Sequence, residues 1–284
     1  MKKEILTLTM VLLVSAMAMA GGNKQVRING FKMRYVESGP KAGEVIIFLH
    51  GYTDSSHSWS STAPLLADKY HTFVLDQRGF GDSQRPQGGY TIPQLAEDVV
   101  AFMDALKIRK AVLVGHSMGT FVAQQVGWVY PERISKLVLV ASGATMVRNA
   151  ALTDVNKTVG APDFQDPISA EFIEAWQTGP NPVAPEFFAR VLQETAKPPA
   201  RVWKAALRGL LTDDHSAFLG NITAPTLIIW GDQDSIFLRA DQDALLAAIP
   251  AAVFKVYAGA GHNVQWEVGR SEQVASDIRA FLER

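Results

Sequence analysis

The 284-residue sequence contains no cysteine. A disulfide framework, a zinc site built from thiolates and a cysteine nucleophile are therefore all excluded. An excess of charge is also missing, because 27 Lys and Arg residues stand against 28 Asp and Glu residues. With so little net charge, the chain offers no electrostatic basis for binding nucleic acid or an anionic membrane surface. Its length allows one large domain with an insertion or two modest domains.

One apolar run lies near the amino terminus. Lysines at positions 2 and 3 precede the apolar residues 5–14, and small residues follow at 18–20. This order of basic, apolar and small residues is typical of a secretory signal peptide. The run is too short to span the ~30 Å membrane core, and no cysteine is available for a lipid anchor. We therefore expect a signal peptide at 1–20, cleavage after Ala20, and a periplasmic or secreted protein without a stable membrane anchor.

Short runs of β-branched and apolar residues recur from residue 44 onward. Uninterrupted runs of this length are typical of parallel strands that are covered on both faces. Between them lie segments with apolar residues at helical spacing, such as 95–106. This alternation predicts an α/β fold with a mostly parallel, doubly wound sheet and a ligand site at the carboxyl ends of the strands. The expected strands are 45–49, 72–75, 111–114, 136–140, 226–230 and 253–257.

The segment 144–221 interrupts this rhythm. It contains no clear strand, several prolines and helical stretches rich in Phe, Trp, Leu and Val. We interpret it as a helical insertion between two strands of one domain. The core of that domain would then consist of residues 21–143 and 222–284.

The stretch Gly115-His116-Ser117-Met118-Gly119 follows an apolar strand and precedes a plausible helix. A strand, a tight turn and a helix with glycines on both sides of a serine form the arrangement called a nucleophile elbow. The glycines let the backbone turn sharply while the serine hydroxyl stays exposed. Because short motifs also occur by chance, Ser117 needs support from other residues.

A serine nucleophile needs a base, and the base needs an acid that orients it. Among six histidines, His262 is favoured because its glycine-rich loop follows the last expected strand and can bring the imidazole over the sheet edge. Asp232 and Asp234 both follow the strand 226–230, at the edge where the site is expected. The residues alone leave the choice between these two aspartates open.

Five motifs together resemble the α/β-hydrolase superfamily, and their Ser, Asp, His order matches that of the family. The resemblance covers nearly all of residues 25–284 except the insertion. It implies an α/β-hydrolase fold in which the insertion 144–221 is a helical cap over the serine. The motifs are Leu49-His50-Gly51, Asp76-Gln77-Arg78-Gly79-Phe80-Gly81-Asp82-Ser83, Gly115-His116-Ser117-Met118-Gly119, Trp230-Gly231-Asp232-Gln233-Asp234 and Gly261-His262.

The resemblance also implies roles for single residues. The last residue of the family's G-x-x-D pattern carries the triad acid, which assigns this role to Asp234 and leaves Asp232 as a turn or helix-cap residue. The backbone N–H groups of Tyr52 and Met118 would form the oxyanion hole. The segment 76–83 is expected to be a structural turn with an internal ion pair.

The identity of residue 117 sets the expected chemistry. Relatives with similar surrounding sequence use aspartate as the nucleophile to hydrolyse epoxides or haloalkanes. Serine instead forms an acyl intermediate from a carbonyl substrate, as in the esterase and lactonase branch of the family. We therefore expect an exported serine hydrolase that cleaves carboxylic esters or lactones with an apolar part, with no metal and no organic cofactor.

Three other interpretations stay open. Gly261-His262-Asn263-Val264-Gln265-Trp266-Glu267 partly resembles a motif of carbon–carbon bond hydrolases that act on dienoates, although Asn263 replaces a tryptophan of that motif. A perhydrolase or haloperoxidase-like enzyme would carry the same triad. A small-molecule binding protein or receptor could keep the triad for capture with slow turnover. We expect Trp266 and Glu267 to be packing residues at the start of a helix.

Overall fold

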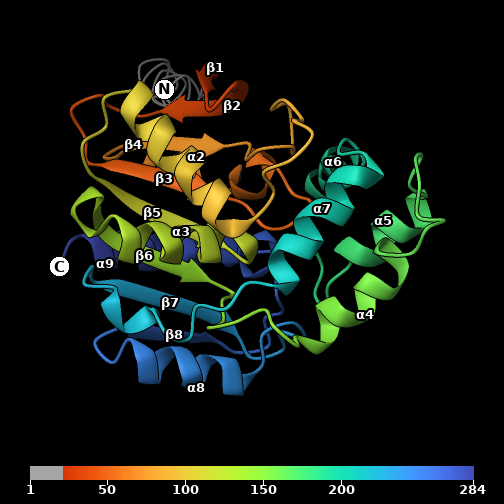
Figure 1. The fold of residues 1–284 in the computed structure, drawn as a ribbon. Helices are drawn as coiled ribbons and strands as arrows, with labels where there is room; N and C mark the ends of the chain where they lie inside the picture. Colours follow the sequence, from red (N-terminus) through yellow and green to blue (C-terminus); the bar gives the residue numbers. More distant parts are fainter. Residues whose placement is uncertain (1–21) are drawn as a thin grey trace, which may run out of the picture.

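The computed structural model describes residues 22–284, and the expected signal peptide lies outside the described residues. Its centre is an eight-stranded sheet in the order β1-β2-β4-β3-β5-β6-β7-β8 (Figure 1). The strands from β4 to β8 pair in parallel, whereas β1 and β2 pair antiparallel. The strands are β1 Gly22–Ile28, β2 Phe31–Ser38, β3 Val45–Leu49, β4 His71–Leu75, β5 Ala111–His116, β6 Ile134–Val140, β7 Thr226–Gly231 and β8 Val253–Tyr257.

The expected α/β fold with a mostly parallel sheet is confirmed, and all six expected strands are present. The central strands are buried on both faces. On β3, Ile46 and Phe48 belong to one apolar cluster, while Ile47 and Leu49 belong to the cluster on the opposite face. Burial on both faces is the reason that these strands appear in the sequence as uninterrupted apolar runs.

The hairpin of β1 and β2 is absent from the expected strands. Its turn is Asn29-Gly30, and both residues have positive φ values of 42° and 80°. An Asn-Gly pair with positive φ is the preferred two-residue turn of a hairpin. In β2 the buried Phe31 and Met33 alternate with more exposed residues. This period-two pattern was the available signal, and it differs from that of the central strands because the hairpin lies at the sheet edge.

Helices cover both faces of the sheet (Figure 1). One apolar cluster joins the sheet to α2, α3 and α8, and the other joins it to α9. This arrangement is a doubly wound sheet, whose ligand sites form at the carboxyl ends of the strands. The covering helices are α2 Ile92–Ala105, α3 Met118–Val129, α8 Arg239–Ala248 and α9 Arg270–Leu282.

Four helices lie between β6 and β7 in the sequence and stand together beside the sheet in Figure 1. They are α4 Ala150–Val159, α5 Ala170–Gln177, α6 Pro185–Thr195 and α7 Ala200–Leu211. The short 3₁₀ helices are η1 Ser56–Trp59, η2 Ala63–Leu66, η3 Pro131–Arg133, η4 Leu219–Asn221 and η5 Val264–Trp266. No helix within residues 22–284 is both long enough and apolar enough to cross a membrane.

Candidate active site

Ser117 occupies the junction between β5 and α3. Its backbone has φ 50° and ψ −119°, a conformation that is rare for a residue with a side chain. Such strain costs about 1–3 kcal/mol and persists only where the surroundings enforce it. Gly115 and Gly119 permit the turn, because a Cβ on Gly115 would overlap the Gly119 carbonyl and one on Gly119 would overlap the Leu49 carbonyl. The structure therefore has the strand, turn and helix that the motif predicts.

The structure brings Asp234 and His262 together. Asp234 follows β7, and both of its carboxylate oxygens lie 3.0 Å from Nδ1 of His262. Oδ1 also accepts hydrogen bonds from the backbone N–H groups of Ile236, at 2.8 Å, and Phe237, at 3.1 Å. Asp232 has a different partner, since its carboxylate accepts the N–H of Gly259 at 2.7 Å. Of the two aspartates, only Asp234 is therefore in position to orient His262.

The surroundings of Asp234 favour its charged form. Burial raises the pKa of this carboxyl, but the charge of His262 and the hydrogen bonds from His262, Ile236 and Phe237 lower it by more. The resulting pKa is below the ordinary aspartate value. Asp234 is thus ionised at neutral pH, and it accepts the Nδ1 proton of His262 and leaves Nε2 free to accept a proton.

Ser117 and His262 line one cavity of about 370 Å³. Within residues 22–284, no hydrogen bond joins their side chains in this structure. Catalytic hydrogen bonds are often long in the absence of substrate and tighten when it binds. Apolar side chains from both the core and the segment between β6 and β7 line the same cavity: Met146, Ala151, Leu152, Val155, Phe172, Ala175, Trp176, Leu210 and Ile236.

The predicted oxyanion donors are the backbone N–H groups of Tyr52, which lines the cavity with Ser117, and of Met118, which follows Ser117 in the chain. Neither donates a hydrogen bond to another protein group within the described residues. For Met118 this follows from its place as the first residue of α3, where N–H groups have no partner inside the helix. The side chain of Tyr52 is buried, and its hydroxyl donates to the Trp203 carbonyl of α7 at 2.8 Å. Tyr52 therefore links the loop after β3 to the helices between β6 and β7.

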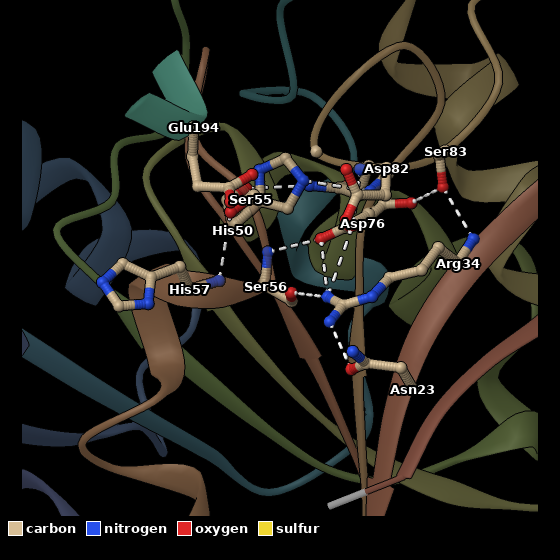
Figure 2. A network of polar contacts seen from close by, with 12 residues as sticks. Asn23, Arg34, His50, Ser55, Ser56, His57, Asp76, Asp82, Ser83 and Glu194 are labelled. Atoms are coloured by element: carbon tan, nitrogen blue, oxygen red, sulfur yellow. Dashed lines mark hydrogen bonds and ion pairs between the residues drawn. The ribbon is translucent and has the colours of Figure 1, made fainter. Parts of the chain in front are cut away.

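A buried polar network holds the loop after β3 in place (Figure 2). Asp76 accepts the backbone N–H of Ser56 at 2.7 Å and that of Asp82 at 2.8 Å. Arg34 donates to the hydroxyl of Ser56 and lies 3.4 Å from the Asp76 carboxylate. Gly81 is needed in this turn, since a Cβ there would overlap the Asp76 carboxylate. The segment 76–83 thus supports the backbone that carries Tyr52.

Arg78, from the same segment, pairs with a residue outside it. Its guanidinium donates two hydrogen bonds to Asp98 of α2, at 2.6 and 2.7 Å, and both side chains are buried. A two-pronged contact of this kind fixes position as well as charge. The ion pair therefore ties the turn to helix α2 and lies outside the lining of the cavity.

The expectation that Glu267 lies at the start of a helix is wrong, because α9 begins at Arg270. The buried carboxylate of Glu267 accepts the backbone N–H of Gly261 at 2.7 Å and the side-chain amide of Asn181 at 3.0 Å. Glu267 thereby fixes the residue next to His262. The Gln265-Trp266-Glu267 part of the partial motif was the available signal for this contact.

Four of the other histidines have structural partners. His50 is buried, with Nδ1 2.8 Å from the Gly51 carbonyl and Nε2 accepting the N–H of Gln77 at 3.0 Å. His57 stacks on Phe187. The remaining contacts are His71 with Glu37 and His215 with Gln124. Within the part of the chain that the structure describes, no three His, Asp or Glu side chains gather as a metal site would need.

Comparisons with known proteins place this geometry in a family. A family model described as alpha/beta hydrolase fold matches residues 44–268. The chain is 30% identical over 264 residues to the dihydrolipoyllysine-residue acetyltransferase component of an acetoin cleaving system from Cupriavidus necator, covering 90% of this chain and 67% of that protein. It is 28% identical over 225 residues to 3-oxoadipate enol-lactonase 2 of Acinetobacter baylyi, covering 79% of this chain and 84% of that protein.

Solved structures give the same result. The N-acyl homoserine lactone degrading enzyme Est816 is 28% identical, with a TM-score of 0.73 over 91% of this chain and 100% of that chain. A hydrolase from Pseudomonas aeruginosa PA01 has a TM-score of 0.82 at 24% identity, over 93% of this chain and 100% of that chain. At such identity the second likeness concerns the fold alone.

Proposed function

This chain belongs to the α/β hydrolase fold family, and from that membership we propose that it is a serine hydrolase that cleaves carboxylic ester or lactone bonds through an acyl-enzyme intermediate. The observation that carries the proposal is the strained Ser117 at a strand–helix turn, in the same cavity as a histidine that is hydrogen-bonded to a buried aspartate. A serine, a histidine and an acid in these relations are the parts of a catalytic triad.

In the proposed mechanism, Ser117 Oγ attacks the substrate carbonyl while Nε2 of His262 accepts the hydroxyl proton. Asp234 stabilises the imidazolium that forms. The oxygen of the tetrahedral intermediate accepts hydrogen bonds from the N–H groups of Tyr52 and Met118. His262 then gives its proton to the leaving alkoxide. A water molecule, deprotonated by His262, hydrolyses the acyl-enzyme and regenerates Ser117.

The cavity and the relatives support this substrate class. A volume of about 370 Å³ and the apolar lining suit a small acyl or alcohol group with an apolar part. One curated relative is named as an enol-lactonase, and one solved relative as an N-acyl homoserine lactone degrading enzyme. Both names describe cleavage of a lactone, in which the ester bond lies within a ring.

The test is covalent labelling with a fluorophosphonate, read as the mass of the intact protein. We expect the wild-type protein to gain one adduct and the Ser117→Ala variant to gain none. Wild-type protein that stays unlabelled would rule out the serine mechanism. If the protein is labelled but hydrolyses no member of a panel of aryl esters and lactones, the result would favour one of two alternatives: a carbon–carbon bond hydrolase, or a small-molecule binding protein that keeps the triad. The perhydrolase alternative is tested by incubating the protein with acetate and hydrogen peroxide, and formation of peracetic acid would support it.

We also propose that the mature protein acts in the periplasm or outside the cell. The support is the order of basic, apolar and small residues in 1–20, which lie outside the described residues. The test is the intact mass of the full-length gene product recovered from a bacterial periplasmic fraction. We expect the mass of a chain that begins at residue 21, and recovery of the unprocessed chain from the cytoplasm would contradict the proposal.

A further inference from the structure

His116 lines the cavity beside Ser117 with only one ring nitrogen hydrogen-bonded. Its Nε2 lies 3.2 Å from the carbonyl oxygen of His262. Since a carbonyl can only accept, Nε2 carries the proton and Nδ1 is an acceptor. Burial lowers the pKa of this imidazole, which keeps it neutral at pH 7. Nδ1 is buried and has no hydrogen-bond partner within residues 22–284.

Asp54 supplies a second acceptor next to the first. Its Oδ2 lies 3.8 Å from Nδ1 of His116, which is too far for a hydrogen bond. Oδ1 accepts from the side-chain amide of Gln177 at 3.1 Å, whereas Oδ2 makes no hydrogen bond within the described residues. No lysine or arginine is among the described residues that line the cavity. The carboxylate therefore faces the substrate space without a cation.

The two acceptors face a common space next to Gly51. A Cβ at position 51 would lie 2.8 Å from Oδ2 of Asp54, 3.0 Å from Nδ1 of His116 and 3.3 Å from Cβ of Ser117. A side chain at position 51 would therefore collide with both acceptors, and glycine avoids this collision. Nδ1 of His116 is buried without a donor, which is unfavourable. Since Oδ2 of Asp54 also lacks a donor within the described residues, a donor placed between the two atoms gains two hydrogen bonds.

We propose that Asp54 and His116 bind a hydrogen-bond donor, a hydroxyl or an amide N–H, on the acyl part of the substrate. The inference rests on the proposed function, because it places the donor relative to the carbonyl that Ser117 attacks. Ser117 Oγ reaches that carbonyl carbon at about 3–3.5 Å, and the space between the acceptors begins beside the same serine. Because the acceptors lie beside the attacking serine, we place the donor on the carbon next to the carbonyl. The substrates are then 2-hydroxy or 2-acylamino esters or lactones.

The primary test uses 4-nitrophenyl esters that share one leaving group. The first pair is the 2-hydroxypropanoate and the 2-methoxypropanoate, and the second is the 2-acetamidopropanoate and its N-methyl analogue. In each pair, the added methyl group removes the hydrogen-bond donor. The 2-methylpropanoate ester controls for the size of the substituent. Rates of alkaline hydrolysis without protein correct for the intrinsic reactivity of each ester. We expect the wild-type protein to prefer the donor in at least one pair by tenfold or more in kcat/KM. A ratio near one in both pairs would overturn the inference.

The variant Asp54→Asn tests which residue is responsible. Its carbonyl can keep the hydrogen bond from Gln177, while its amide replaces the Oδ2 acceptor by a donor and so removes the acceptor pair. We expect the donor preference to fall to about one, with a melting temperature no lower than that of the wild type. The control Asp82→Asn, at an exposed carboxylate paired with Lys197, should keep the wild-type ratio.

The outcomes separate this inference from the proposed function. A wild-type preference that survives in Asp54→Asn would overturn the role of Asp54. If the Asp54→Asn variant does not fold, the kcat/KM ratios of the ester pairs with wild-type protein still show whether a donor on the substrate is preferred. Wild-type protein that hydrolyses the plain propanoate ester without donor preference contradicts only this inference. Protein that takes no fluorophosphonate and hydrolyses no ester contradicts the proposed function itself.

Discussion

Replacing Asp234 by asparagine tests the proposed triad at its acid. Oδ1 of Asp234 accepts two backbone N–H groups, from Ile236 and Phe237. Since an asparagine has one carbonyl oxygen, these two donors hold that oxygen in place and the amide NH₂ turns toward Nδ1 of His262. Nδ1 must then accept, and the imidazole proton moves to Nε2. In that tautomer His262 cannot take the proton of Ser117.

The expected loss is large because the tautomer is wrong for every molecule of the variant. The same substitution in serine proteases of an unrelated fold lowers kcat about 10⁴-fold, and at about 1.36 kcal/mol per tenfold this equals about 5 kcal/mol of barrier. The assay is kcat on a 4-nitrophenyl ester, with Asp232→Asn as the matched control. Asp232 is exposed and contacts Gly259, so its variant should lose less than tenfold. A larger loss from Asp232→Asn would refute the assignment of the acid.

The pH dependence of stability follows from the same carboxyl. The folded-state pKa of Asp234 is lowered, because the charge and hydrogen bonds around it outweigh the effect of burial. Its ionisation therefore stabilises the folded state fully above the unfolded-state pKa of about 3.9, and this contribution is lost as pH falls through the lowered pKa. Thermal melts of wild type and Asp234→Asn should differ by less at pH 3 than at pH 7. A difference that grows toward pH 3 would contradict this sign.

Substitutions at three further positions follow from the contacts around the site. Glu267→Ala should lower kcat about tenfold or more by freeing the N–H of Gly261, and Glu267→Gln should restore most of it, as steady-state assays can show. Tyr52→Phe removes the hydrogen bond from the Tyr52 hydroxyl to the Trp203 carbonyl, which should cost about 1–2 kcal/mol and lower the melting temperature by about 2–8 °C. Asp98→Asn breaks a buried ion pair and should cost about 3–5 kcal/mol, measured by urea unfolding.

Local patterns in the sequence carried most of the information about the fold. Central strands such as β3 and β5 are buried on both faces, so their uninterrupted apolar runs were sufficient to place them. The hairpin of β1 and β2 lies at the sheet edge and buries only alternate residues, which is a weaker pattern in the sequence. The turn at Ser117 could also be predicted from the sequence, because the two glycines that it requires, Gly115 and Gly119, lie within two residues of the serine.

Contacts between distant segments could be decided only by the tertiary structure. Asp232 and Asp234 are equivalent as sequence neighbours of a strand, and the resemblance alone favoured the second. The structure shows that only Asp234 contacts His262. In the same way, Glu267 contacts the loop of His262, and Asp54 meets His116 in the cavity.

The sequence by itself therefore determined the six strands β3 to β8 and serine as the residue at the turn. It did so because a buried strand requires consecutive apolar residues, and a strained turn requires glycines next to it in the chain. The tertiary structure decided which acid faces His262 and which two acceptors face the substrate space. Those pairings depend on how the parallel sheet aligns its strand ends, and no spacing along the chain encodes that alignment.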